Sequence, residues 1–407
     1  MKILDGGITA PIGFEAAGVE AGVKYANRKD MAIIYSQKPC VTAGTFTSNV
    51  VKAAPVKWDM NIVENSEYAQ AVIVNTGIAN AGTGKEGMEY CKKTAKKTAE
   101  VLGIPENAVF VGSTGVIGAQ LPMDKITAGI DKLVAAKAHT KEAGTDASKA
   151  IMTTDTVNKE LAVSVEIGGK TVTIGAMSKG SGMIHPNMCT MLGYVTTDAV
   201  IGKEALTKIV KEDVVDTYNM ISVDGDTSTN DTLLIMANGM AGNDEIRIGT
   251  SEFDIFKEAI HYVNETQAKR LAGDGEGATA LVECTVCGAD TKDNARILAK
   301  SVICSSLTKA AVYGHDANWG RILCALGYSG AKFDPENMEL YYAAGDKKML
   351  IYRDGADAGY SEEEASEILS QKEVRIIADM KMGNAKATAW GCDLTYDYVK
   401  INADYRS

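Results

Sequence analysis

Short apolar runs separated by turn residues dominate the first part of the chain. The runs at 31–35, 44–47 and 70–77 have the length and β-branched content of strands, with connecting loops between them. The stretch 75–84 that follows is rich in Gly and Asn and is not expected to form a regular element. It is either an ordered loop near a functional site or simply a long connection.

Helical periodicity begins after residue 84. One face of a predicted helix carries apolar or small side chains, with lysines opposite: Met88, Cys91, Ala95, Thr98 and Leu102. A strand at 108–111 then runs into the glycine-rich turn 112–118. Pro122 suits the first turn of a second helix, whose apolar stripe is Ile126, Ile130, Leu133 and Val134.

The middle of the chain alternates strands and helices. Strands at 161–167 and 171–177 joined through Gly168 and Gly169 predict a hairpin. It leads into the stretch 179–190 and then an apolar run at 191–200. A helix over 203–220 and a strand over 233–236 are expected next, separated by the acidic, hydroxyl-rich loop 222–232. That loop does not fit a calcium-binding loop, because Thr229 and Ile235 stand where Gly and Glu are required.

The last third of the chain continues the mixture. Ser251 with Asp254 forms a capping signature for a helix that carries Phe256, Ile260, Val263 and Leu271. A strand is expected at 278–287, a short helix after 314–321, and a helix capped by Ser361 with Glu364. Alternation predicts strands at 374–379 and 387–401. Strands mixed with helices and hairpins, rather than strict βαβ repetition, predict an α+β fold with layered sheets and helices.

Composition narrows the function classes. The formal charge of −11 and the scattered Lys and Arg argue against a nucleic-acid partner or an anionic membrane surface, and favour a small-molecule partner. No apolar run approaches the ~18–20 residues of a membrane helix, and the N-terminus lacks the apolar core of a secretory signal. A soluble, cytoplasmic protein is expected. Eight dispersed cysteines suit a reduced compartment, and neither the Cys284–Cys287 pair nor the four histidines have metal-site spacing.

The stretch 179–199 carries the candidate nucleophile. Gly180 and Gly182 free the backbone and Pro186 fixes one φ angle, so a strained turn can aim the Thr190 hydroxyl at the carbonyl carbon of Cys189. An N-to-O acyl shift and hydrolysis would then leave Thr190 as a new N-terminus. Its α-amino group, with a pKa near ~7.7–8.0, could act as the base for its own hydroxyl. The alternative is a buried strand that follows an ordinary glycine turn.

Two further sites could serve acyl transfer. The turn 112–118 lacks the ending of a phosphate loop and the spacing of a dinucleotide fingerprint, but Thr114 and Gly115 could supply the donors of an oxyanion hole. Glu276 lies between glycines in 273–277, which would allow close approach of a ligand. The alternative for Glu276 is a solvated carboxylate in a turn.

Together these segments resemble the ornithine acetyltransferase (glutamate N-acetyltransferase) family of arginine biosynthesis. Ordered motifs along essentially the whole chain carry the resemblance: 6–11, 113–118, 153–155, 179–187, 190–192, 224–232, 273–278, 318–321 and 402–407. The resemblance implies cleavage before Thr190 into an α segment, 1–189, and a β segment, 190–407, that stay associated, as an α2β2 assembly. It also implies acetyl transfer from N2-acetyl-L-ornithine to L-glutamate through an acetyl-Thr190 intermediate, without a metal or organic cofactor.

The resemblance also assigns roles to individual residues. Thr190 is the nucleophile, and Thr114 with the Gly115 N–H holds the oxyanion. Lys179 and Thr153, or its neighbour Thr154, contact the substrate; a cation at 179 suits the α-carboxylate that both amino acids share. Glu276 suits the side-chain ammonium of ornithine, and Asn402 and Ser407 bring the C-terminus to the site. Acetyl-CoA is a possible second donor, which would add N-acetylglutamate synthase activity; no residue decides this.

Three departures from the family pattern concern efficiency and substrate range more than reaction class. Cys189 replaces the usual alanine before the cut, Ile78 and Gly82 replace Asn and Cys, and residues 314–317 read Gly-His-Asp-Ala.

Two competing functions remain. One is a self-cleaving amidohydrolase or aminopeptidase, in which water replaces glutamate as acceptor. The other is a non-catalytic amino-acid-binding protein that keeps the pocket without the cut.

Overall fold

The computed structural model describes residues 1–185 and 191–404. Two compact units divide the chain: the first comprises residues 1–180, the described part of 186–215, and 227–267; the second comprises 181–185, 216–226 and 268–404. The first unit therefore contains residues from both sides of the 189/190 bond. Cleavage there would not separate the two units from each other.

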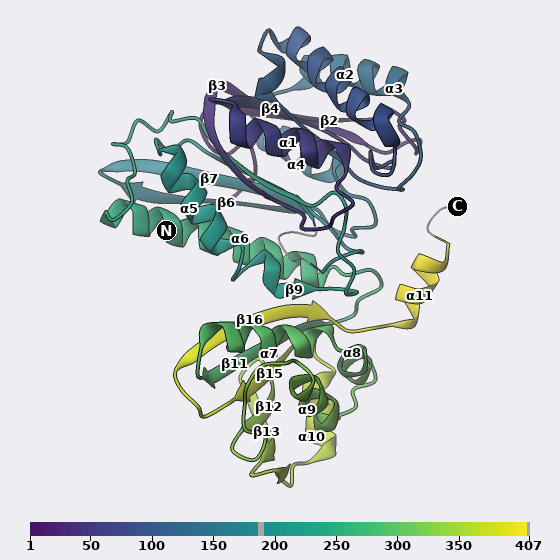
Figure 1. The fold of residues 1–407 in the computed structure, drawn as a ribbon, viewed down its shortest axis with the longest axis vertical. Helices are drawn as coiled ribbons and strands as arrows, with labels where there is room; N and C mark the ends of the chain where they lie inside the picture. The colour runs from purple at the N-terminus through teal and green to yellow at the C-terminus, as the bar shows by residue number, and fades with distance from the viewer. Residues whose placement is uncertain (186–190, 405–407) are drawn as a thin grey trace. The chain divides into compact units, whose positions relative to one another are not determined.

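The first unit is built on a nine-stranded sheet among the described residues (Figure 1). The sheet order is β1 (Lys2–Leu4), β6 (Lys159–Ile167), β7 (Lys170–Lys179), β8 (Leu192–Thr197), β10 (Thr232–Ala237), β3 (Met31–Phe46), β4 (Ala69–Asn75) and β5 (Val109–Ser113), with β2 (Phe14–Val19) also paired to β3. The helices are α1 (Ala54–Asn65), α2 (Gly84–Leu102), α3 (Met123–Ala136), α4 (Lys141–Ala150), α5 (Lys203–Asp213) and the first part of α6 (Ser251–Gly273).

Alternation along the strands divides the core of this unit in two. Met31 and Ile33 of β3 face one hydrophobic cluster together with α2 and α3, whereas Ala32 and Ile34 face another together with α1 and α4. β4 and β5 alternate in the same way. Figure 1 shows α2 and α3 on one side of β3 and β4, and α1 and α4 on the other. Helices thus cover both faces of these strands, which confirms the layered α+β prediction.

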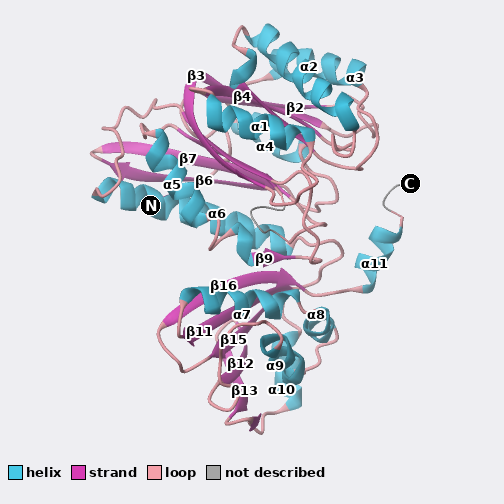
Figure 2. Ribbon diagram, in the orientation of Figure 1, coloured by secondary structure: helices cyan, strands magenta, loops and turns pink. Residues whose placement is uncertain are grey.

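The second unit holds a seven-stranded mixed sheet, counted over its described residues (Figure 2). Its order is β14 (Ala356–Asp357), β13 (Lys347–Arg353), β12 (Glu339–Ala344), β15 (Glu373–Asp379), β11 (Leu281–Ala289), β16 (Ala385–Cys392) and β9 (Ile221–Ser222). The helices are α7 (Lys292–Cys304), α8 (Ser306–Tyr313), α9 (Trp319–Gly327), α10 (Glu362–Leu369) and α11 (Tyr396–Ala403). α7 packs along β11 and β16. Cys284 and Cys287 are strand residues of β11.

Local turn and cap chemistry confirms several elements. Gly168 and Gly169, with φ of 57° and 75°, make the turn of the β6–β7 hairpin. Ser361 caps α10, since its side chain accepts a hydrogen bond from the Glu364 N–H. The cap of α6 differs from the prediction: Thr250 Oγ1, rather than Ser251, accepts from the N–H of Phe253 at 3.2 Å. Pro122 likewise immediately precedes α3 instead of lying in its first turn.

Two predicted elements end early. The helix expected over 203–220 is α5, which stops at Asp213; a separate 3-10 turn covers Tyr218–Met220. The buried Asp213 carboxylate accepts a hydrogen bond from Asn264 Nδ2 at 2.7 Å, which holds the end of α5 against α6. The strand expected over 387–401 is also wrong beyond Cys392. Thr395 Oγ1 accepts from the Tyr398 N–H, so the chain begins α11 there.

Candidate active site

Thr114 and Gly115 follow directly after β5, against the 75–84 loop. Gly115 has a φ of 129°, and a Cβ there would lie 2.3 Å from the carbonyl carbon of Gly77, so only glycine fits. The Thr114 N–H donates to Asn75 O at 3.1 Å. Within the described chain, the Gly115 N–H donates to no acceptor. The 75–84 loop is therefore ordered beside the predicted oxyanion residues, and one of the two expected donors is free to bind a ligand.

Lys179 is the last residue of β7 and is only 7% exposed. Its Nζ donates a hydrogen bond to Thr114 Oγ1 at 3.4 Å. An ammonium group has no lone pair, so the Thr114 hydroxyl must be the acceptor in this contact. The hydroxyl proton of Thr114 therefore remains available to a developing oxyanion. Lys179 also pairs with Leu192, the second residue after Thr190 in the chain.

Asp155 joins the loop after α4 to the end of β7. Its Oδ1 accepts from Lys159 Nζ and from the Gly180 N–H, both at 2.7 Å, and its Oδ2 accepts from the Thr153 N–H at 3.0 Å. Burial raises the pKa of the Asp155 carboxyl, but Lys179, Lys159 and the Gly180 N–H together lower it more, to about 2. This carboxylate is therefore ionised throughout the range in which the protein is expected to work.

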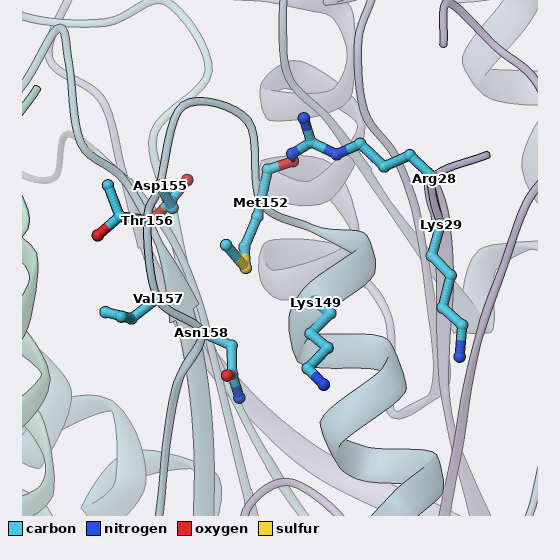
Figure 3. Close-up of a pocket in the computed structure, with 8 residues that line it drawn as sticks. All are labelled: Arg28, Lys29, Lys149, Met152, Asp155, Thr156, Val157 and Asn158. Carbon is cyan, nitrogen blue, oxygen red and sulfur yellow. Dashed lines mark hydrogen bonds between the residues drawn. The ribbon is translucent and has the colours of Figure 1, made fainter. Parts of the chain in front are cut away.

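The loop that carries Thr153 is also held from its other side. Arg28 Nη2 donates to the carbonyl oxygens of Met152 and Thr153 at 2.7 and 2.8 Å. This side chain reaches toward Met152 at the edge of a pocket (Figure 3). The volume of the pocket is about 490 Å³. The pocket is lined by Arg28, Lys29, Lys149, Met152, Asp155, Thr156, Val157 and Asn158. Lys29 pairs with Asp146, and Arg28 binds the two carbonyl oxygens. The hydrogen bonds of Arg28 therefore hold the Thr153 loop from the side of this pocket.

In the second unit, Glu276 is 5% exposed, and its Oε2 accepts a hydrogen bond from Asn402 Nδ2 of α11 at 2.7 Å. The solvated-carboxylate alternative is therefore wrong. A Cβ at Gly182 would lie 2.3 Å from Glu276 Oε2, and one at Gly277 would lie 2.7 Å from the Tyr398 N atom. The missing side chains of these glycines thus leave room for other segments of the protein to pack closely, and these segments surround the Glu276 carboxylate on several sides.

The segment that leads toward Thr190 is anchored within the second unit. The Asp224 carboxylate accepts from the N–H groups of Met183 and Ile184 at 2.6 and 2.9 Å, and Ser181 Oγ donates to Asp274 O at 2.6 Å. Met183 has a φ of 53°, a left-handed conformation that is uncommon for a residue with a side chain. These contacts confirm that 222–232 begins as a hydrogen-bonded loop, and they fix a strained turn at 181–184.

His185 follows this turn as a neutral side chain. Its Nδ1 lies 3.0 Å from Ser222 Oγ, and burial, with the positive charge of Lys300, lowers the pKa of its imidazole to about 4. Above that value the ring carries no charge, so it contributes hydrogen bonding rather than an ion pair at this position.

Comparisons with known proteins decide the family. The model of the ArgJ family matches residues 15–407. The chain is 52% identical over 407 residues to the arginine biosynthesis bifunctional protein ArgJ of Caldanaerobacter subterraneus subsp. tengcongensis, with 100% of both chains covered. It is 52% identical over 409 residues to the protein of that name from Symbiobacterium thermophilum, again with 100% of both covered. The chain belongs to the ArgJ family.

A solved structure from the ArgJ family agrees with this assignment. The crystal structure of the arginine biosynthesis bifunctional protein argJ from Bacillus halodurans is 43% identical, with a TM-score of 0.50. The match covers 52% of the present chain and 98% of the solved one. The resemblance inferred from the sequence motifs is thereby confirmed at the level of the family, an enzyme family of arginine biosynthesis.

The ArgJ motifs fall into three groups in the structure. The first unit brings together Thr114, Gly115, Lys179 and the Thr153 loop, and the second brings together Glu276 and Asn402. The third group, Cys189, Thr190 and Ser407, lies outside the described residues. Thr153 is tied to Asp155 through its backbone N–H, which gives no preference between its side chain and that of Thr154 as the substrate contact.

Sequence reasoning gave no role to Asp155 or Lys159, although the motif 153–155 was singled out. A signal was present: an acidic residue four positions before a lysine that opens an apolar strand. Both charges are fully buried, with side chains 0% exposed.

Among the described residues, no group of three or more His, Cys, Asp or Glu could hold a metal ion. No helix in the described ranges is long and apolar enough to cross a membrane.

Proposed function

We propose that this member of the ArgJ family transfers the acetyl group of N2-acetyl-L-ornithine to L-glutamate, which yields L-ornithine and N-acetyl-L-glutamate. Support comes from the full-length identity to bifunctional proteins of arginine biosynthesis. The observation that carries the chemistry is the pairing of Lys179 with Thr114 beside a Gly115 N–H that has no acceptor among the described residues. Oriented donors without a prior partner are what a tetrahedral acyl-transfer intermediate requires.

The nucleophile would be created by cleavage between Cys189 and Thr190, which separates segments 1–189 and 190–407. The left-handed Met183 and the contacts of Asp224 support this, because backbone strain that the surrounding structure holds in place gathers at functional sites. The solved Bacillus halodurans chain matches about half of this chain over nearly all of its own length. That length is expected of one of the two segments.

In the first half-reaction, the α-amino group of Thr190 removes the proton from its own Oγ. The Oγ attacks the acetyl carbonyl carbon of N2-acetyl-L-ornithine, and the oxygen that becomes negative accepts from the Thr114 hydroxyl and the Gly115 N–H. When the C–N bond breaks, the Thr190 ammonium returns the proton to the leaving α-amine. Ornithine departs, and the acetyl group stays on Thr190 as an ester.

In the second half-reaction, the α-amine of L-glutamate attacks the ester carbonyl in the same oxyanion hole. Its proton passes to the Thr190 amine and then to the departing Thr190 Oγ, which restores the enzyme. Lys179 and Thr153 hold the α-carboxylate that both substrates share. Glu276 binds the side-chain ammonium of ornithine, while Asn402 and Ser407 border the substrate. Every proton transfer uses groups of the chain and its substrates, so no cofactor is invoked.

Three further properties belong to the proposal. The relatives are named bifunctional, which favours a second acetyl donor; we assign this to acetyl-CoA, with N-acetylglutamate synthase activity as the result. The two segments remain associated as an α2β2 assembly. The enzyme works in the cytoplasm on small molecules, without a nucleic-acid or membrane partner.

The proposal is tested on the purified full-length chain by intact mass, N-terminal sequencing and an acetyl-transfer assay. Segment lengths of 189 and 218 residues predict fragments of roughly 20 and 23 kDa, the larger beginning Thr-Met-Leu-Gly-Tyr. Ornithine release should require glutamate and match N-acetylglutamate formation one to one. Glutamate-independent release would indicate a hydrolase instead, and an uncut chain that binds without turnover would indicate a binding protein. Acetyl-CoA with glutamate then tests the second activity.

Replacing Glu276 by alanine is expected to leave cleavage intact and to raise the KM for N2-acetyl-L-ornithine by about 10- to 100-fold, the range for one charge-assisted contact. Steady-state kinetics with each substrate measure this change. Glu276→Gln separates charge from shape, since its amide keeps the side-chain volume and loses the charge that binds ammonium. Glu336→Ala, an exposed glutamate of the same unit, is the matched control and should behave as wild type. Unchanged acetylornithine kinetics in Glu276→Ala would remove Glu276 from the substrate site.

A further inference from the structure

One buried carboxylate connects the separate parts of the chain that carry the proposed substrate contacts. The Asp155 carboxylate, on a side chain that is 0% exposed, accepts from the backbone N–H of Thr153 on one side and from that of Gly180, the residue after Lys179, on the other. These two contacts fix the loop after α4 relative to the end of β7. A third, from Lys159 Nζ, anchors Asp155 itself to the start of β6.

Asp155 also balances charge around this point. Lys159 and Lys179 are both buried, and both act electrostatically on the Asp155 carboxyl. Buried ammonium groups are strongly unfavourable unless a counter-charge is near. Lys179 additionally donates to Thr114 Oγ1. The carboxylate thus allows a cation to remain in a buried position beside the oxyanion residues.

Outside contacts reinforce the same loop. Arg28 Nη2 donates to the carbonyl oxygens of Met152 and Thr153, and the Asp155 carboxylate accepts from the Thr153 N–H. Figure 3 shows Arg28 reaching toward Met152. The backbone of Thr153 is therefore held at both its N–H and its C=O. Hydrogen bonds to both groups of one residue leave the backbone of the loop little freedom to move.

On the basis of the proposed function, we propose that Asp155 is a positioning residue for acetyl transfer. It holds Thr153 and the Lys179 ammonium where the α-carboxylate of each substrate binds. Asp155 does not contact the substrate: its two oxygens are occupied by Lys159, Gly180 and Thr153. Its effect passes through Lys179, whose Nζ donates to the Thr114 hydroxyl and whose ammonium is proposed to bind the α-carboxylate of the substrate.

The test compares substrates with and without the α-carboxylate. N-acetylputrescine is N2-acetyl-L-ornithine without that group, and 4-aminobutyrate is L-glutamate without it. In Asp155→Asn, the preference for N2-acetyl-L-ornithine over N-acetylputrescine, as a ratio of kcat/KM values, should fall by about 10- to 100-fold. The preference for glutamate over 4-aminobutyrate should fall in parallel. A purely structural role would lower all the rates together and leave both ratios unchanged, which would overturn the inference.

Matched variants keep the test decisive. Asp131→Asn removes an exposed aspartate that pairs with Lys97 in the same unit, away from the Thr153 loop, and should leave both ratios as in wild type. Lys159→Met keeps Asp155 and its contacts to Thr153 and Gly180, so selectivity should stay within about twofold of wild type. The double variant Asp155→Asn/Lys159→Met removes the Lys159 ammonium together with its counter-charge, and should fold with the selectivity of Asp155→Asn alone.

Each remaining outcome also bears on the proposal. Recovery of wild-type selectivity in the double variant would show that the loss in Asp155→Asn came from a buried Lys159 ammonium without its counter-charge, and would contradict the role given to Asp155. Intact mass is measured for every variant; a double variant that stays uncut would place the effect in maturation and contradict the inference equally. If the wild-type enzyme itself transfers no acetyl group, the proposed function fails, and this is visible before any variant is compared.

Discussion

Replacing Thr190 by alanine is expected to leave one uncut chain of 43.1 kDa without detectable acetyl transfer. Both effects have one cause, since the same hydroxyl is proposed to attack the peptide carbonyl of Cys189 and later the acetyl group. Without cleavage the residue also lacks the free α-amine that serves as its base. Intact mass measures the first effect and ornithine release measures the second.

Thr190→Ser is the matched control for this change. It keeps a hydroxyl on the same carbon and should be cut, with acetyl transfer retained at a lower rate. Cys189→Ala tests the residue on the other side of the bond; it restores the family's usual alanine and should be cut at least as fast as wild type. A Thr190→Ala chain that still appears as two fragments would place the cleavage at another bond.

The sequence predicted elements well where their signals are local. The β6–β7 hairpin depends on two adjacent glycines that adopt positive φ, and α10 depends on one serine cap. The long strand β3 was predicted only at its two ends, as runs 31–35 and 44–47. Residues 37–39 in its middle are exposed, and the pairing with β4 shifts register between Tyr35 and Cys40. Polar residues at that irregularity interrupt the apolar pattern without ending the strand.

Helix α11 shows the opposite error. Tyr396, Val399 and Ile401 extend the apolar character of β16 and predicted a continuing strand, yet these side chains are 82%, 65% and 37% exposed. Periodicity locates an element only when its apolar side is buried. Here the Thr395 cap decides the conformation, and it places Asn402 next to Glu276, 126 residues away in the sequence.

The candidate site shows the same difference between local signals, which the sequence contains, and long-range contacts, which it does not. The sequence identified which residue types could perform acyl transfer, because the motifs that contain Thr114, Lys179 and Glu276 are ordered and specific. It did not identify the contacts between them. The Lys179–Thr114 hydrogen bond spans 65 positions, and the role of Asp155 depends on the Gly180 N–H, 25 positions away. Contacts of this length arise from sheet pairing and core packing, for which a local pattern contains no information.

Thr114→Val should reduce kcat for acetyl transfer by about 10²–10³-fold, the usual effect of removing one oxyanion donor. Valine matches threonine in shape, so the backbone at Gly115 and its free N–H should remain in place. The hydroxyl is not proposed to bind the ground state, which predicts a KM for N2-acetyl-L-ornithine within a few-fold of wild type. Steady-state kinetics on the cleaved enzyme separate the two quantities.

Thr114→Ser keeps the hydroxyl that accepts from Lys179 Nζ and should retain kcat within about tenfold of wild type. The pair of variants therefore distinguishes loss of a donor from loss of packing. A Thr114→Val enzyme with normal kcat and a raised KM would mean that Thr114 binds the substrate in its ground state. In that case the free Gly115 N–H would be the donor to the oxyanion, and the ammonium of Lys179 would be the next group to test.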